Sequence, residues 1–225
     1  MAVASPVSER LTVAALLLLT FATGLVDAIS VLVLGHVFVA NMTGNVIFLG
    51  FWFVPHSDVD LTAALVAFVS FMVGAAMGGR LARRLDHDVR LWLTAAMSFE
   101  VVALLVLSLL AGTGILQYHD SGRLILISGL AVVFGGQSMA ARRFGIQELS
   151  TTVLTATIVG IGADSRLAGG TGEREKLRYA VVFTMLSGAA LGATLSRFVV
   201  APVIALAALS VAAALTIFRY GRSAS

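Results

Sequence analysis

The stretch FVANMTGNVIFLG, residues 38 to 50, decides how this chain crosses a membrane. Apolar residues flank a cluster of small polar ones, Asn41, Thr43, Gly44 and Asn45. Their amides and hydroxyl need hydrogen-bond partners, which an apolar environment does not supply. The apolar segment around them, 37–54, is also shorter than the about 20 residues with which a helix crosses the hydrocarbon core. We therefore predict an interruption of the helix here, permitted by Gly44, with spare polar atoms that can hold a solute.

The composition of the whole chain is that of an integral membrane protein. Of its 225 residues 59% are hydrophobic and only 12% are charged, and the mean hydropathy is +0.99. A soluble fold of this size cannot bury so much apolar surface, so we expect the lipid bilayer to be its main partner. The net charge of +3 does not indicate nucleic-acid binding, because most basic residues lie in short loops between apolar runs.

The chain offers little to a metal or a cofactor. Cysteine is absent, and none of the four histidines forms an HxxxH or HExxH pattern. GQSMA at 136–140 is similar to a serine-protease motif, but no histidine follows His119 to act as the base. We therefore expect no catalytic residues, no metal site and no cofactor, and an enzyme is the least favoured class.

Eight apolar segments follow one another, and two of them are unusual. Segments 37–54 and 146–163 are short, rich in Thr, Asn and Gly, and follow their predecessors with almost no loop. Each is either a separate short span or a re-entrant piece attached to the preceding helix. The remaining six are 11–34, 61–79, 91–110, 124–141, 177–196 and 200–218. The first resembles a signal peptide at its start, but it continues past Asp27 to Leu34, so we expect a retained span.

The positive charges favour six crossings. The 80–90 and 164–178 loops each contain four Lys or Arg residues, which marks them as cytoplasmic, whereas 55–60 contains none and 111–123 contains only Arg123. Six full spans with two broken or re-entrant segments satisfy every loop, and eight spans do not. The prediction is an all-α transmembrane bundle in the cell (inner) membrane with both termini in the cytoplasm.

An internal repeat predicts how the bundle is organised. VGAAMGGRLARRL at 73–85 matches SGAALGATLSRFV at 187–199, and weaker matches precede both. The chain thus divides into two three-span repeats, 1–114 and 115–225, within one membrane domain. An odd number of spans gives the copies opposite orientations, which is an inverted repeat of three plus three. Both copies carry small residues at every fourth position, which predicts close helix packing between the halves: Ser70, Gly74, Gly78 and Ala82, and Thr184, Gly188, Gly192 and Ser196.

Several polar residues fall inside predicted spans. Asp27 lies deep in the first span, where a charge costs on the order of 3 kcal/mol, and Glu100 lies at the middle of the 91–110 span. Each is either a structural acid bonded to a neighbouring helix or part of a solute or proton site. Gln137 takes the place of Asp27 in the second copy, and Thr155 and Thr157 offer hydroxyls in the second short segment.

The motif that runs from the first span into the first short segment, residues 24 to 50, resembles that of the YoaK-like family of bacterial membrane proteins (domain of unknown function 1275). The residues that carry the resemblance are Gly24, Asp27, Ala28, Phe38, Thr43, Gly44, Asn45 and Gly50. The second half is similar through Gly135, Gln137 and the Thr-rich stretch from Thr151 to Thr157, but has Ala156 where the family often has glycine. The resemblance covers nearly the whole chain and implies a membrane protein without implying a substrate.

These observations lead to two hypotheses from different classes. In the first, the protein is a transporter or channel for a small solute, bound by Asp27, Asn41, Thr43, Gly44, Asn45, Gln137, Thr155 and Thr157, with Glu100 or Asp27 exchanging protons. In the second, it is a non-transporting scaffold or subunit whose polar residues only hold helices together. The substrate, the coupling ion and a homo-oligomeric state stay open at this stage.

Overall fold

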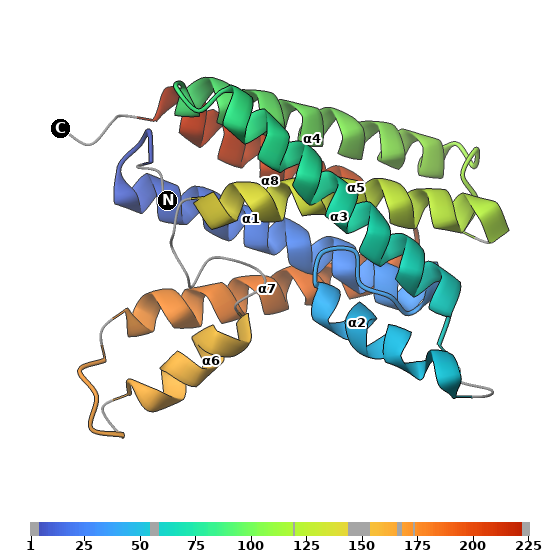
Figure 1. The fold of residues 1–225 in the computed structure, drawn as a ribbon, viewed down its shortest axis with the longest axis horizontal. Coiled ribbons are helices and arrows are strands. Elements are labelled where there is room, and N and C mark those ends of the chain that lie inside the picture. Colours follow the sequence, from blue (N-terminus) through green and yellow to red (C-terminus); the bar gives the residue numbers. More distant parts are fainter. Residues whose placement is uncertain are drawn as a thin grey trace.

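The fold is a bundle of helices, known from a computed structural model that describes residues 5–54, 59–118, 120–143, 154–165, 168–172 and 174–221 (Figure 1). Within these residues the regular structure is helical throughout, as the composition predicted. The long helices are α1 (Glu9–Ile29), α3 (Leu61–Arg84), α4 (Val89–Gly112), α5 (Asp120–Arg143), α7 (Glu175–Ser196) and α8 (Ala201–Tyr220). The short ones are α2 (Met42–Gly50) and α6 (Leu154–Ala163), with a π-helical turn η1 (Ser30–Gly35) and a 3₁₀ turn η2 (Phe51–Phe53).

The prediction of six spans and two short segments is confirmed. Six helices of the described chain are long and apolar enough to cross a membrane, and α2 and α6 are shorter apolar helices. The start of the second short segment, 146–153, lies outside the described residues, and so do Glu148, Thr151 and Thr152. The class of the protein and its number of candidate spans therefore follow from the sequence.

Aspartates fix where two of the spans begin. The Asp60 carboxylate accepts the backbone N–H of Ala63 at 2.9 Å, and the Asp88 carboxylate accepts that of Leu91 at 2.9 Å. Each satisfies one of the backbone donors left free in a first helical turn, which is typically worth about 1 kcal/mol. Because α4 begins directly after Asp88, the connection between α3 and α4 is short, and these two spans are antiparallel.

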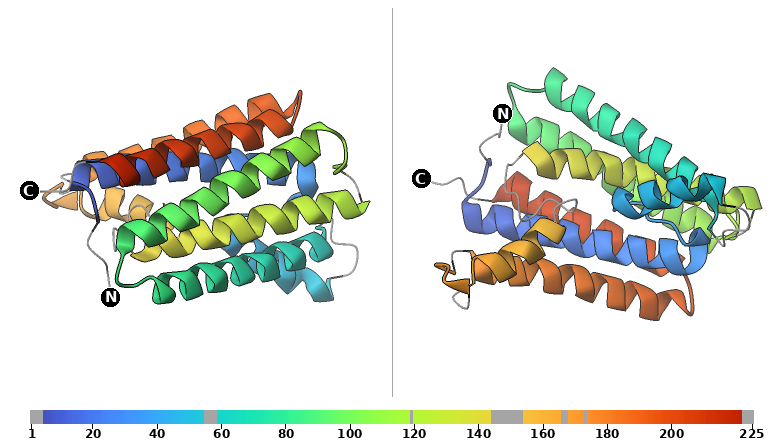
Figure 2. Two further views of the ribbon diagram at one scale, coloured as in Figure 1. Left: turned by 90° about the horizontal axis from the view of Figure 1, so that it is seen from above. Right: turned by 60° about the horizontal axis from the view of Figure 1, so that its bottom comes forward.

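The helices pair across the two halves of the chain. α3 packs along α5, α7 packs along α1, and α4 packs along α8. Each of these pairs joins a helix of the first half to a helix of the second half. Figure 2 shows these helices lying side by side, and α2 and α6 lie against α3 and α7 respectively. In α1, α5 and α8, 61%, 56% and 50% of the residues of the apolar window are buried, against 22%, 28% and 17% in α3, α4 and α7. α1, α5 and α8 are therefore the inner helices.

Glycines let these pairs approach closely, as the small-residue pattern predicted. A Cβ on Gly74 would collide with the carbonyl oxygen of Val132 in α5, and a Cβ on Gly188 would collide with that of Phe21 in α1. One helical turn before Gly74, the Ser70 hydroxyl of α3 forms a hydrogen bond of 2.9 Å with the Ser128 hydroxyl of α5. In lipid, where burying apolar surface gives little gain, such close backbone packing and polar contacts are the main source of association.

The interruption after the first span is real, but it lies earlier than predicted. The chain unwinds into η1 and then turns at Gly35 (φ 132°) and His36 (φ 59°), whereas Gly44 lies within the helix α2. Gly35 suits the turn because its φ is one that side chains rarely allow, and because a Cβ there would lie 3.2 Å from Nη1 of Arg123. The Ser30 hydroxyl donates to the Val37 carbonyl at 2.7 Å and closes the turn.

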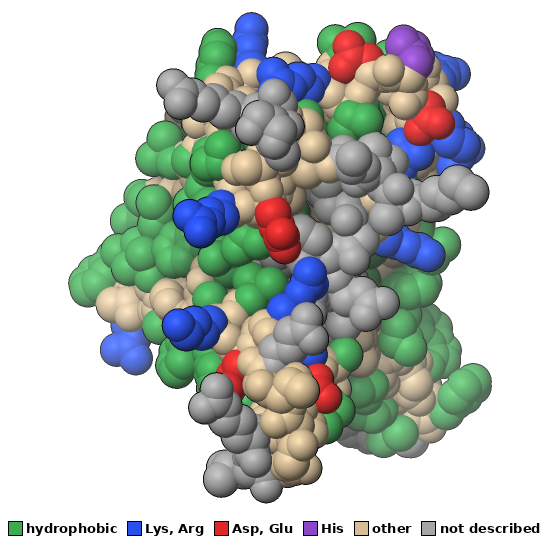
Figure 3. All heavy atoms as spheres, turned by 90° about the vertical axis from the view of Figure 1, so that its left-hand side faces the viewer, with side chains coloured by type: hydrophobic (Ala, Val, Ile, Leu, Met, Phe, Trp, Pro, Cys, Tyr) green, Lys and Arg blue, Asp and Glu red, His purple; other side chains and the backbone are tan. Residues whose placement is uncertain are grey.

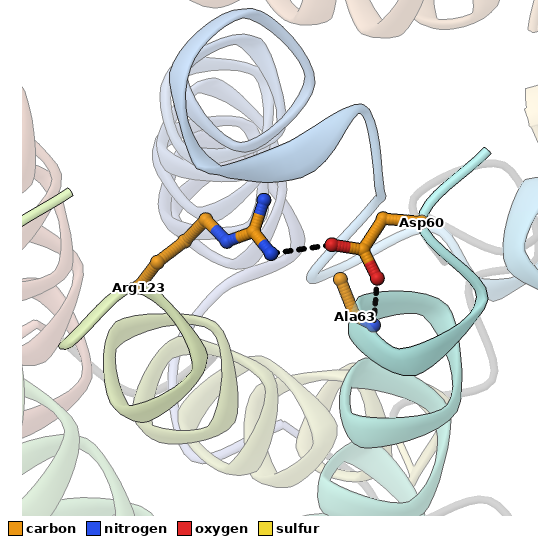
Figure 4. A network of polar contacts seen from close by, with 3 residues as sticks. All are labelled: Asp60, Ala63 and Arg123. Atoms are coloured by element: carbon orange, nitrogen blue, oxygen red, sulfur yellow. Dashed lines mark hydrogen bonds and ion pairs between the residues drawn. The ribbon is translucent and has the colours of Figure 1, made fainter. Parts of the chain in front are cut away.

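Charged side chains gather at the end of the bundle where α1 begins (Figure 3). The segment before α1 and the residue after α8 are joined there by Arg90, whose guanidinium donates to the carbonyls of Pro6 at 3.0 Å and Gly221 at 3.2 Å. At the opposite end Arg123, the cation that stood out in the 111–123 loop, forms an ion pair with Asp60 (Figure 4). Asp60 thereby caps α3 and neutralises Arg123 at once.

Candidate functional site

Asp27 anchors the turn that joins α1 to α2. Its Oδ1 accepts the backbone N–H groups of Val39 and Ala40, both at 2.9 Å, and its Oδ2 accepts the Nδ2 of Asn41 at 2.5 Å. Asp27 is 5% exposed, and the two amide groups belong to buried residues. Backbone that leaves a helix inside a membrane needs such partners, since lipid offers none. The Asp27 carboxylate therefore accepts hydrogen bonds from backbone N–H groups that the interrupted helix leaves without helical partners.

Asn45 fixes the same turn from the side of α2. Its Oδ1 accepts the Phe38 N–H at 2.9 Å and its Nδ2 donates to the Phe38 carbonyl at 2.6 Å, so one side chain satisfies both backbone groups of Phe38. The Phe38 ring rests on Gly44, where a Cβ would come within 2.6 Å of the ring. Gly44 is thus required for packing, and it does not break the helix.

These contacts explain the opening cluster of polar residues without a bound solute. The carboxylate of Asp27 and the carboxamide of Asn45 are occupied by the chain itself, and Asn41 is joined to Asp27. Thr43 is exposed. Within the TGN stretch, Gly44 and Asn45 therefore have an internal role.

A cavity of about 360 Å³ lies elsewhere in the bundle, between α3, α4 and α5, with one side formed by α1. Its walls are mostly apolar, and Gly74, Gly78 and Gly136 line it with backbone. Three polar side chains reach it: Trp92 and Glu100 from α4, and Gln137 from α5. Asp27, Asn41 and Asn45 do not line it.

The three polar side chains of the cavity carry unsatisfied atoms. Trp92 Nε1, Glu100 Oε1 and Gln137 Oε1 are buried and have no hydrogen-bond partner, and the residues are 2%, 4% and 4% exposed. A buried polar atom without a partner costs about 1–3 kcal/mol, and more when it is charged. One donor and two acceptors of this kind on one cavity are what a bound polar molecule satisfies.

Gln137 is oriented by the inner helix α1. Its Nε2 donates to the hydroxyl of Thr23 at 3.2 Å and to the carbonyl of Leu19 at 3.4 Å. The amide nitrogen is therefore used, and the amide oxygen is left for the cavity. Thr23 and Asp27, four residues apart on α1, thus have different roles, because Thr23 supports Gln137 while Asp27 supports the turn.

Arg143, at the end of α5, packs against Trp92, which lines the cavity. The guanidinium lies 5.5 Å from the centre of the Trp92 ring, donates to the Ala82 carbonyl at 3.1 Å and pairs with Asp86 at 2.7 Å. Because Asp86 follows α3 directly, this contact joins α3, α4 and α5 where they approach the charged end of the bundle. Trp92, which also lines the cavity, does not stand out in the sequence, where its one signal is an indole N–H in an apolar span.

Comparison with known proteins gives the family. The family described as "Protein of unknown function (DUF1275)" matches residues 15–217. The chain belongs to this family. It is also 34% identical over 159 residues, 69% of this chain and 67% of the relative, to the "UPF0700 transmembrane protein YoaK" of Bacillus subtilis (strain 168). No solved structure matches this chain.

The resemblance to the DUF1275 family rested on residues that build the turn. Asp27, Phe38, Gly44 and Asn45 are the bonded or stacked partners described above, and Gly24 lets α7 approach α1, since a Cβ there would collide with the Met185 carbonyl. This motif therefore identifies how the first half of the chain folds.

The structure separates the predicted site residues into groups. Gln137 and Glu100 share the cavity, whereas Asp27, Asn41, Gly44 and Asn45 form the turn. Thr155 is exposed on α6 and Thr157 is buried there, on a helix that packs against α7. Among the described residues no three His, Cys, Asp or Glu side chains lie together as a metal site would require.

Proposed function

We propose that this membrane protein carries a small solute across the bilayer, and that the solute occupies the cavity between α3, α4 and α5. The observation that carries the proposal is the set of three unsatisfied buried atoms of Trp92, Glu100 and Gln137 on one cavity wall. An ionisable side chain inside a membrane is costly and is by default a sign of function. Glu100, at the middle of α4, is the group that exchanges protons with the solute.

The helix pairing supports an inverted-repeat architecture, which many transporters share. The α3–α5 contact has a counterpart in α7–α1, and the α2–α3 contact in α6–α7. Gly24 and Gly135 each meet the backbone of the partner helix, and in this register Ser138 corresponds to Asp27. The sequence comparison had instead matched Asp27 with Gln137, one residue away.

The charge distribution supports the orientation. The end at which α1 begins and α8 ends carries most of the Lys and Arg residues, including those of the α3–α4 connection. We therefore propose that this end faces the cytoplasm, in the cell (inner) membrane of a bacterium. The end of the cavity that Trp92 lines, where Arg143 packs against the indole ring, then faces the cytoplasm.

The rival proposal is a scaffold that transports nothing. The fully bonded Asp27 and Asn45 network favours it, because those residues serve the fold alone. Glu100 discriminates between the two, because a scaffold gains nothing from a buried carboxyl group without a partner, and replacing such a group by an apolar one is often stabilising.

The test is transport by the purified protein in liposomes. A panel of amines, amino acids, carboxylic acids, sugars and inorganic ions is applied under an imposed pH gradient, with currents and internal pH recorded. We expect at least one solute to give a saturable signal that Glu100→Gln abolishes and Thr43→Ala preserves. Silence of wild type toward every solute, together with a Glu100→Leu protein more stable than wild type, would establish the scaffold.

A further inference from the structure

The cavity opens sideways between α3 and α4. Of its lining residues, Met77 of α3 is 47% exposed and Phe99 of α4 is 55% exposed, so these two form the rim. α3 and α4 hardly touch each other and diverge from their connection, with α5 as the floor between them (Figures 1 and 2). Phe99 precedes Glu100, halfway along α4, so the mouth faces the acyl chains near the middle of the bilayer.

The wall of the cavity favours an occupant that is apolar over most of its surface. Its side chains are Leu, Met, Ala, Val, Phe and Trp residues apart from Glu100 and Gln137, and glycine backbone makes up the rest. A molecule that reaches the cavity through the mouth comes from the hydrocarbon region, where strongly hydrated solutes do not partition. The occupant is therefore lipophilic over most of its surface.

The polar end of the occupant must match Glu100. Among the described residues that line the cavity none is Lys, Arg or His. Arg143, which packs against the Trp92 ring, is held by Asp86 and the Ala82 carbonyl. Oε1 of Glu100 and Oε1 of Gln137 have no hydrogen-bond partner and can each accept a hydrogen bond. A carboxyl group in an apolar cavity is either protonated or matched by a positive charge, and a cationic occupant supplies that charge.

We propose that the cavity binds a lipophilic amine, which enters from the bilayer between α3 and α4 and places its ammonium group on Glu100 and Gln137. This proposal rests on the proposed function and names its substrate class. The ammonium N–H groups satisfy both acceptors, and the apolar body fills the cavity towards Met77 and Phe99.

The two tryptophans of the chain, Trp52 and Trp92, allow a direct test. In a Trp52→Phe protein the only indole is that of Trp92, on the cavity wall. This protein, in phosphatidylcholine nanodiscs, is titrated with 4-(4-bromophenyl)butylamine, whose bromine quenches indole fluorescence on contact. The matched alcohol and the matched carboxylic acid are titrated in parallel, because they share the apolar body.

We expect saturable quenching by the amine, with an apparent affinity about 30-fold or more above that of the alcohol and the acid, as an unpaired buried charge would require. Adding Glu100→Gln should reduce the affinity for the amine to that for the alcohol. Adding Glu9→Gln, which removes an exposed carboxylate at the start of α1, should change nothing. Thermal unfolding of each variant checks that it is folded.

Other results would overturn the proposal in distinguishable ways. Equal quenching by amine and alcohol, or stronger quenching by the acid, rejects the amine and leaves a solute cavity, provided that Glu100→Gln still changes the binding. Quenching by none of the three compounds, with a Glu100→Gln protein more stable than wild type, rejects both the amine and the proposed function.

Discussion

Replacing Asp27 by alanine should destabilise the protein by about 2–6 kcal/mol. The change removes the acceptor of the Val39 and Ala40 N–H groups, which lie 2.9 Å from Asp27 Oδ1 in residues that are 0% and 2% exposed. Each buried donor left without a partner costs about 1–3 kcal/mol, and two are released. Asp27→Asn keeps an oxygen for both donors but turns an amide nitrogen toward Asn41, so its cost should be smaller, about 1.5–3 kcal/mol.

The free energy of unfolding can be measured by reversible SDS titration in mixed micelles, followed by circular dichroism. Hydrogen exchange at Val39 and Ala40 adds a local readout, since these amides should lose protection in Asp27→Ala before the spans do. Thr43→Ala, at an exposed position of the same segment, is the control and should stay within about 0.5 kcal/mol of wild type. An Asp27→Ala protein as stable as this control, or less affected than Asp27→Asn, would refute the anchoring role.

Two further predictions concern the packing and the ends of the spans. Gly74→Ala should destabilise the protein by about 1–3 kcal/mol, because the added Cβ meets the Val132 carbonyl. Gly162→Ala, with open space around the added Cβ, should be neutral or should stabilise α6 by up to about 1 kcal/mol. SDS titration compares the unfolding free energies of the two variants. Asp60→Ala should cost about 1 kcal/mol more than Asp60→Asn, because asparagine keeps the α3 cap while both lose the charge that faces Arg123; equal melting temperatures of the two variants would contradict the cap.

Among the described residues, Asp27 and Glu100 are the buried carboxyl groups, and their surroundings differ. Asp27 and Glu100 both lie within spans, and each had a structural and a functional interpretation. Asp27 receives three hydrogen bonds from the unwound segment, whereas Glu100 Oε1 receives none. The bonding of Asp27 fits the structural interpretation, and the function proposed above rests on Glu100.

What the sequence could predict about the site was limited to the polar residues themselves. It singled out Glu100 and Gln137, but it joined them to Asp27 and Asn45, because a repeat alignment and a shared motif treat these residues as one set. The packing of α4 and α5 along α3 and α1 brings Gln137 and Glu100 to one cavity and adds Trp92 to it. Gln137 comes from a different helix than Trp92 and Glu100, and no spacing along the chain encodes its proximity to them.

The sequence by itself determined the family, the all-helical membrane class, the six spans and the charged end. It could do so because the bilayer imposes a minimum apolar length on each span and because flanking charges act locally along the chain. Only the tertiary structure decided that the chain turns at Gly35 and His36 rather than at Gly44, and which polar atoms are left unpaired. Both depend on which helix backbones meet, and in this protein the meeting points are set by glycine contacts between segments more than fifty residues apart.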